Sequence, residues 1–107
     1  MKTIWKFPLD LCDQQQIPMP KGAQILTLQT QNGVPCIWVM VEDDAVEAEM
    51  RTFEIFGTGT EITKEKGFGR CYIGTFQRQQ FVWHVFERYV PVDDETAVLD
   101  LGRVNVN

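Results

Sequence analysis

A short glycine turn is the segment whose residue types come nearest to a ligand-binding motif. Residues 57–60 read Gly-Thr-Gly-Thr, and turns of this kind can present backbone N–H groups to a phosphate. Basic side chains flank the turn along the sequence, among them Lys64 and Lys66. A P-loop or dinucleotide motif also needs a following helix, which the sequence does not indicate. The segment is therefore either an anion site or a turn that ends a strand. The candidate anion-binding residues are Arg51, Gly57, Thr58, Gly59 and Arg70.

His84 is the only histidine of the chain, and the chain contains no serine. A Ser-His-Asp triad is therefore excluded, and Cys-His catalysis would need His84 beside Cys12, Cys36 or Cys71. The histidine stands between Trp83 and a valine in a strand-like run, which is typical of a packed or half-exposed side chain. We predict no catalytic residue and no enzymatic activity, and we keep His84 as a residue that contacts a partner or ligand.

Metal-binding patterns do not occur at the spacings that metals require. The three cysteines include no Cys-x-x-Cys pair, which zinc sites commonly use. Residues 43–44 and 93–95 are acidic clusters without the alternating ligands of a calcium loop. Neither a metal nor a cofactor is expected.

The cysteine count and the N-terminus predict the compartment. An odd number of widely spaced cysteines does not form the even framework of small secreted domains, so free thiols are expected. The first residues, MKTIWKFP, lack the apolar run and cleavage site of a signal peptide. A cytoplasmic location is the resulting expectation.

The charge balance limits the classes of partner. Ten basic residues stand against 15 acidic ones, a formal net charge of −5. Nucleic-acid binders need a positive footprint that displaces counterions from phosphates, so direct general nucleic-acid binding is not expected. No apolar run is long enough to span a bilayer, so no membrane contact is expected either. An acidic surface suits a basic protein partner, although the same charge also serves solubility.

Three tryptophans are many for a chain of 107 residues. They can pack in a core, and they can also form a docking surface, since tryptophan is enriched at binding hot spots. We expect two of the three to lie in the core. Trp38 is the candidate for partner contact.

The clearest structural signal is a hairpin centred on Asn32-Gly33. Two apolar runs, 23–31 and 34–42, flank this dipeptide, and Asn-Gly favours the tight turn that joins antiparallel strands. In the second run, odd and even positions are both apolar. That pattern indicates either a central strand or a strand whose outer face meets a partner.

The rest of the chain reads mainly as strands. Alternating or apolar runs at 2–9, 51–57, 70–77 and 81–89 predict strands, with Arg51 and Arg70 at the start of two of them. In the run 70–77, alternation places Cys71, Ile73 and Thr75 on one face and Tyr72 on the other. Further expected features are an extended piece at 14–19, a helical turn or loop at 43–50, a loop at 61–69 and a last strand at 96–101.

These elements predict an all-β fold. We expect a small antiparallel sandwich or a partly open barrel of six to seven strands with little helix. The length fits a single β domain over residues 1–107. Its core is expected to cover residues 1–90, with a C-terminal extension at 91–107.

Several segments together resemble a family of small uncharacterised proteins encoded by phages and prophages of bacteria. The segments, in order, are MKTIWKFPL, IPMPKGAQILTLQTQNGVPCIW, RTFEIFGTGTEI, YIGTFQ and FVWHVFE. The resemblance covers roughly residues 1–87, so residues 88–107 are expected to be an addition. It implies no activity and no catalytic residue, only a phage or prophage context in which small acidic proteins often block a host component.

Three functions follow as expectations. The first is a non-enzymatic binding protein that inhibits a host or defence protein by docking on it. The second is a sponge for a small anionic ligand such as a nucleotide, and the third is a minor structural or assembly protein of a phage particle. The sequence does not specify the oligomeric state and allows a homodimer.

Overall fold

A computed structural model describes residues 1–91 of the chain as seven antiparallel strands in two sheets. The predicted all-β fold is confirmed, with the architecture of a small sandwich. The strands are β1 (Lys2–Pro8), β2 (Gln14–Pro20), β3 (Gln24–Gln31), β4 (Val34–Glu42), β5 (Ala48–Gly57), β6 (Gly69–Arg78) and β7 (Phe81–Tyr89). The last predicted strand, at 96–101, and the acidic cluster at 93–95 lie outside the described residues.

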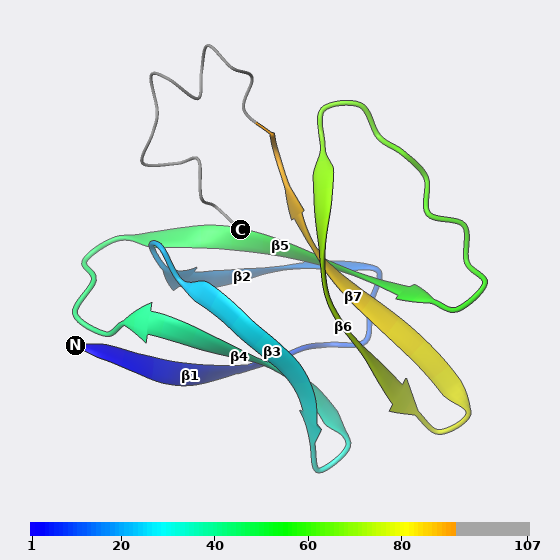
Figure 1. Cartoon of the computed structure of the whole chain (residues 1–107), viewed down its shortest axis with the longest axis horizontal. Coiled ribbons are helices and arrows are strands. Elements are labelled where there is room, and N and C mark those ends of the chain that lie inside the picture. Colours follow the sequence, from blue (N-terminus) through cyan, green and yellow to red (C-terminus); the bar gives the residue numbers. More distant parts are fainter. Residues whose placement is uncertain (92–107) are drawn as a thin grey trace.

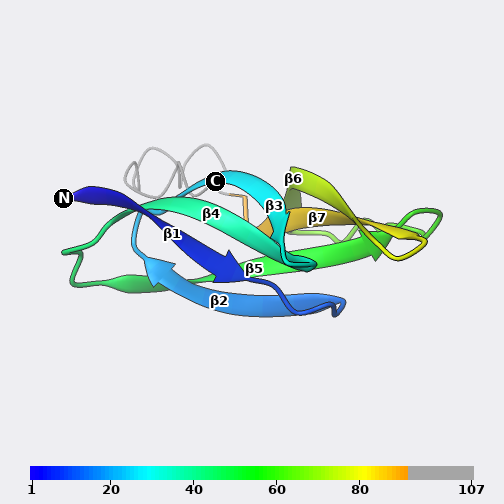
Figure 2. The ribbon, with the colours of Figure 1, turned by 90° about the horizontal axis from the view of Figure 1, so that it is seen from below.

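The two sheets are a three-stranded sheet of order β1-β4-β3 and a four-stranded sheet of order β2-β5-β7-β6. Figure 2 shows the three-stranded sheet lying over β2 and β5, and Figure 1 shows β6 and β7 extending to one side. On that side the edge strands β3 and β6 meet. A methyl group on Gly74 would lie 3.0 Å from Cβ of Leu28, so a glycine allows the two edges to come this close.

The Asn32-Gly33 hairpin is confirmed. Strands β3 and β4 pair antiparallel down to Gln31 and Val34. Asn32 and Gly33 have φ angles of 52° and 79°, the left-handed conformation that both central residues of a type I′ turn require. β4 is the central strand of its sheet, which explains its apolar residues on both faces.

Replacing Asn32 with valine should lower the free energy of unfolding by about 1–2 kcal/mol, because a β-branched residue is strained at positive φ. Chemical denaturation measures the change. Thr30→Val, in the adjacent strand of the same hairpin, serves as the control and should leave stability nearly unchanged, since valine suits a strand. Equal stability of Asn32→Val and the unmodified protein would contradict the turn assignment.

The core lies between the two sheets. Ile37 and Val39 of β4 face Phe53 of β5 and Val85 of β7, and all four side chains are fully buried. Burying each apolar side chain of this size contributes roughly 1.5–3 kcal/mol. Because side chains alternate along a strand, the side chains on the opposite face of β5 and β7 point away from the three-stranded sheet.

A buried ion pair extends the core between β5 and β7. Arg51 and Glu87 are 3% and 4% exposed. Nη2 of Arg51 donates to Oε1 of Glu87 at 2.9 Å, Nε donates to Oε2, and Nη1 donates to the Ala23 carbonyl at 2.8 Å. Burial alone would lower the pKa of Arg51, but the hydrogen bond and charge of Glu87 raise it above its ordinary value.

Some sequence expectations are wrong in detail. Of the two structures expected at 43–50, the helical turn is wrong: the chain forms a turn and loop up to residue 47, and β5 begins at Ala48. Arg51 therefore lies inside a strand instead of opening one. Of the tryptophans, only Trp83 packs against the core cluster, because Trp38 belongs to the outer face of the central strand and Trp5 to an edge strand.

The structure also bears on the state of the cysteines, on metal binding and on membrane-spanning helices. Cys12, Cys36 and Cys71 are free thiols, and Cys36 is the buried one. Within residues 1–91, no three His, Cys, Asp or Glu side chains are grouped so as to hold a metal ion. The same residues include no helix with the length and apolarity of a membrane span.

Candidate functional site

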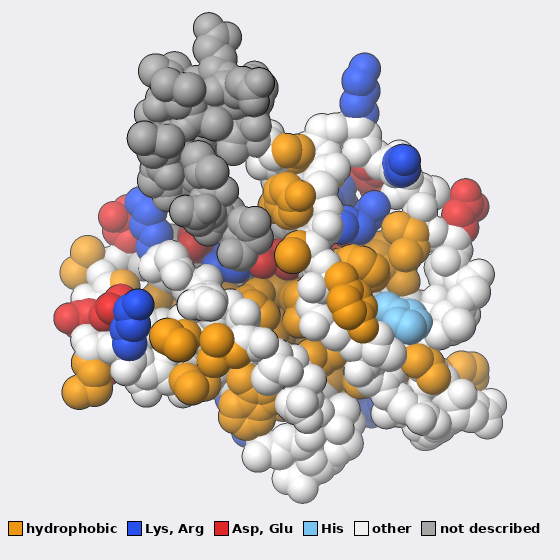
Figure 3. Space-filling model, viewed as in Figure 1, with side chains coloured by type: hydrophobic (Ala, Val, Ile, Leu, Met, Phe, Trp, Pro, Cys, Tyr) orange, Lys and Arg blue, Asp and Glu red, His pale blue; other side chains and the backbone are white. Residues whose placement is uncertain are grey.

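The outer face of the four-stranded sheet gathers aromatic side chains from three strands. On β5 and β7 the residues that alternate with the buried Phe53 and Val85 are Phe56, His84 and Phe86, and β6 adds Tyr72. We call these four side chains, Phe56, Tyr72, His84 and Phe86, the aromatic face. Figure 3 shows hydrophobic side chains gathered beside the pale blue histidine, with basic side chains next to them.

The aromatic rings of this face pack edge to face. The Phe56 and Phe86 ring centroids are 5.8 Å apart at 72°, and the Tyr72 and Phe86 centroids are 5.4 Å apart at 63°. Such pairs gain roughly 0.5–1.5 kcal/mol beyond the area that they bury. Tyr72 nevertheless remains 56% exposed. The arrangement is a fixed aromatic surface open to solvent.

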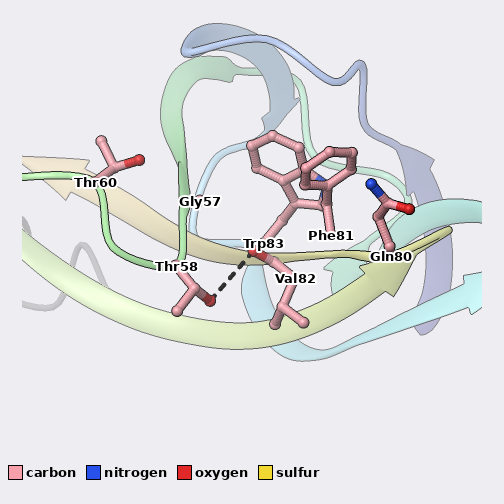
Figure 4. Close-up of a pocket in the computed structure, with 7 residues that line it drawn as sticks. All are labelled: Gly57, Thr58, Thr60, Gln80, Phe81, Val82 and Trp83. Atoms are coloured by element: carbon pink, nitrogen blue, oxygen red, sulfur yellow. Dashed lines mark hydrogen bonds between the residues drawn. The ribbon is translucent and has the colours of Figure 1, made fainter.

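Two threonines hold the imidazole of His84. The hydroxyl of Thr58 lies 2.8 Å from Nε2, and that of Thr75 lies 2.9 Å from Nδ1. The Thr58 hydroxyl also lies 3.4 Å from the carbonyl oxygen of Val82 (Figure 4). The Thr75 hydroxyl in turn bonds the hydroxyl of Tyr72.

This chain of hydrogen bonds crosses the aromatic face from Tyr72 to the turn after β5. Both ring nitrogens of His84 are engaged with hydroxyl groups, and no cysteine takes part in these contacts. His84 thus links Thr58 with Thr75, and through Thr75 with Tyr72, so these side chains are held in one arrangement.

Two arginines border the aromatic face, and carboxylates engage both. Arg70 donates from Nε to Glu54 at 2.6 Å and from Nη1 to the Thr63 carbonyl at 2.9 Å, and its guanidinium lies 5.4 Å from the Phe56 ring centroid. The hydrogen bond to Glu54 raises the pKa of Arg70 above its ordinary value. Arg70 is therefore a fixed cation with a partner inside the chain.

Arg88 is held in the same way. It donates to Gln14 at 3.0 Å and to Glu54 at 3.5 Å, and it also pairs with Glu65. Its guanidinium lies 3.8 Å from the Phe68 ring centroid, a stacked cation–π contact. The contacts of Arg88 and Arg70 tie the loop between β5 and β6 to the outer face of the sheet.

The structure brings only some of the sequence-predicted residues together. Thr58 contacts His84, and Gly57 and Gly59 belong to the same turn, with Gly59 at a φ of 89°. Arg70 reaches the same face through Phe56. Two predicted residues do not join them: Arg51 is in the core, and Trp38 is on the three-stranded sheet.

The comparisons with known proteins give a family without an assigned function. A sequence-family model described as a domain of unknown function, DUF7352, matches residues 1–96. The chain belongs to the DUF7352 family. No curated protein and no solved structure matches the chain. The DUF7352 match extends beyond residue 87, so residues 88–96 are part of the family pattern, and the expectation that they are an addition is wrong.

Within the DUF7352 domain, sequence reasoning missed most of the aromatic face. Alternation along residues 81–89 predicts one strand face with Val82, His84 and Phe86 and the opposite face with Phe81 and Val85. The structure has the same two faces. Phe56 joins that group only once the pairing of β5 with β7 is known. The residues of the candidate site that were not predicted are Glu54, Phe56, Tyr72, Thr75, Phe86 and Arg88.

Proposed function

We propose that this DUF7352 domain is a non-enzymatic binding protein that docks on a protein partner through its aromatic face. The observation that carries the proposal is the position of Tyr72. Its ring is more than half exposed, yet Phe86 and the Thr75 hydroxyl hold it in place. Tyrosine and arginine are enriched at hot spots, and a preorganised aromatic side chain loses little entropy on binding.

The sequence resemblance to phage and prophage proteins supports a partner in the bacterial host, such as a defence component that the domain inhibits by covering its surface. The net charge of −5 supports a partner with a basic surface, because opposite potentials speed association. Docking then needs no reaction at the site.

The anion-sponge alternative needs cations that are free to meet the ligand. Arg51 donates its hydrogen bonds to Glu87 and to the Ala23 carbonyl. Arg70 donates its hydrogen bonds to Glu54 and to the Thr63 carbonyl. A ligand that drew either arginine away from its carboxylate would leave that carboxylate without its partner. For the buried pair, this loss would cost folding free energy. These contacts favour protein docking over nucleotide binding.

A thermal-shift screen of nucleotides and cyclic nucleotides tests this choice. A ligand present at about 100 times its Kd would add about 2.7 kcal/mol to the free energy of unfolding, which raises the Tm of a domain of this size by several degrees. We expect no shift with any of these nucleotides. A concentration-dependent shift that Arg70→Ala abolishes would overturn docking in favour of the sponge.

A further inference from the structure

Strand β1 forms a free edge of the three-stranded sheet. Within the described residues it pairs with β4 on one side and has no strand on the other. Figure 1 shows β1 along the lower left margin of the molecule, with β2 of the other sheet set back from it. An edge strand presents unpaired backbone N–H and C=O groups, which can pair with a further strand. The edge of β1 is therefore a surface on which the sheet can be extended.

Alternate residues of β1 direct their backbone groups to this free edge. At the ends of the strand, the Met1 carbonyl accepts a hydrogen bond from Asp43, and the Leu9 N–H donates to a carbonyl beside β4. The backbone groups of the odd-numbered residues therefore face β4, because hydrogen-bonded positions alternate along an antiparallel pair. The residues whose N–H and C=O groups consequently point outward are Lys2, Ile4 and Lys6.

The other edges of the two sheets are less open to pairing. β3 and β6 lie against each other where the two sheets meet. On β2 the backbone groups of odd-numbered residues face β5, because the Asp13 carbonyl accepts a hydrogen bond from Ile55. The outward positions of β2 then include Pro18 and Pro20, which have no N–H to donate. Such prolines commonly protect a sheet edge. Among the described strands, β1 thus offers the most complete free edge.

The side chains of β1 add apolar surface to this edge. Trp5 faces the same way as Phe7, which packs against the core, and the two ring centroids are 6.3 Å apart. Trp5 is nevertheless 40% exposed, and Ile4 on the opposite face is 56% exposed. Nζ of Lys6 donates to Oε1 of Gln31 on β3 at 2.5 Å. The charge of Lys6 therefore lies over the sheet and away from the free edge.

We propose that β1 pairs antiparallel with β1 of a second copy of this chain, about a two-fold axis at Trp5. In this register Ile4 of each copy lies opposite Lys6 of the other. Because both residues direct their backbone groups outward, they exchange N–H···O=C hydrogen bonds. Lys2 lies opposite Pro8, whose carbonyl accepts a hydrogen bond although proline donates none. The two Trp5 side chains meet at a position without hydrogen bonds, where cross-strand neighbours are closest.

The lysines favour this register over the neighbouring ones. A two-fold axis at Ile4 would place Lys2 opposite Lys6, and an axis at Lys6 would place that residue opposite itself. Like charges directly opposite each other destabilise a strand pair. An axis at Thr3 or Phe7 would pair less of the strand. β1 is therefore self-complementary, as a two-fold interface requires. The aromatic face belongs to the other sheet, so the dimer presents it twice.

Sedimentation velocity of the unmodified protein and of two variants at Ile4 tests the pairing. One pair of strands is smaller than a standard interface, so we expect the dimer to form at about 10–500 µM protein. Ile4→Lys puts lysines opposite each other at both Ile4–Lys6 positions and should raise the dimer dissociation constant roughly tenfold. Ile4→Glu puts opposite charges at the same positions and should keep the dimer.

Met50→Lys is the matched control, because Met50 is 57% exposed on β5 of the other sheet. It should leave dimerisation unchanged, and thermal unfolding confirms that each variant is folded. A dimer on which Ile4→Lys and Ile4→Glu have the same effect would overturn the proposed register. An unmodified protein that stays monomeric at the highest of these concentrations would overturn the pairing itself, and this measurement does not depend on the folding of any variant.

Discussion

Replacing Arg51 with alanine should remove about 3–5 kcal/mol of folding stability, because it leaves the Glu87 carboxylate buried without its partner. Both side chains are almost fully buried between β5 and β7. The change also takes the donor from the Ala23 carbonyl. Natural domains are stable by about 5–15 kcal/mol, so this single substitution should bring the protein close to unfolding. Urea denaturation followed by tryptophan fluorescence measures the loss.

Two control variants separate the buried pair from surface charge. The double variant Arg51→Met with Glu87→Leu should recover much of the lost stability, since an apolar pair of similar volume carries no desolvation penalty. Lys21→Ala breaks an exposed pair with Glu47 and should change stability by less than about 1 kcal/mol. A loss for Arg51→Ala as small as that for Lys21→Ala would show that the pair does not stabilise the core.

The second large effect concerns the proposed protein partner. Tyr72→Ala should weaken binding by about 2 kcal/mol, roughly thirtyfold, because a central aromatic anchor is lost. Its effect on folding should be small, since the side chain is 56% exposed. Titration calorimetry with the purified partner measures the affinity, and thermal unfolding confirms that the variant is folded.

Ile4→Ala is the matched control for Tyr72→Ala. Ile4 is also 56% exposed, but it belongs to β1 of the other sheet. We expect it to leave the affinity unchanged. If Ile4→Ala weakens binding while Tyr72→Ala does not, the partner docks on the three-stranded sheet, where Trp38 also lies.

Strand positions could be predicted from the sequence because their signals are local. Asn32-Gly33 fixes one hairpin, and alternation along residues 81–89 sorts that strand's side chains into two faces, as the structure has them. The pairing of β5 with β7 depends on contacts between segments far apart in the chain. For that reason the burial of Arg51 against Glu87 could not be predicted.

A bulge in β6 explains the largest error at the site. Strict alternation places Thr75 with Cys71 and Ile73, on the face opposite Tyr72. The register of β6 shifts between Tyr72 and Gly74, and an extra residue reverses the faces that follow it. Thr75 consequently lies on the same face as Tyr72 and bonds both Tyr72 and His84.

The close approach of β3 to β6 could not be predicted either. The sequence shows Gly74 within a strand, which indicates a bulge or a close backbone contact, but it does not name the contact. In the structure the contact is Leu28 of the other sheet. A pattern within one strand carries no information about which neighbour fills the space beside it.

Hydroxyl-radical footprinting of the domain, free and bound to its purified partner, tests the docking surface most directly, because it reads the solvent access of individual side chains. The aromatic face predicts that Tyr72 is oxidised readily in the free protein and is strongly protected in the complex. Ile4 and Trp38, on the other sheet, should react equally in both states. Protection of Ile4 and Trp38 with Tyr72 still fully reactive would contradict the proposed docking surface.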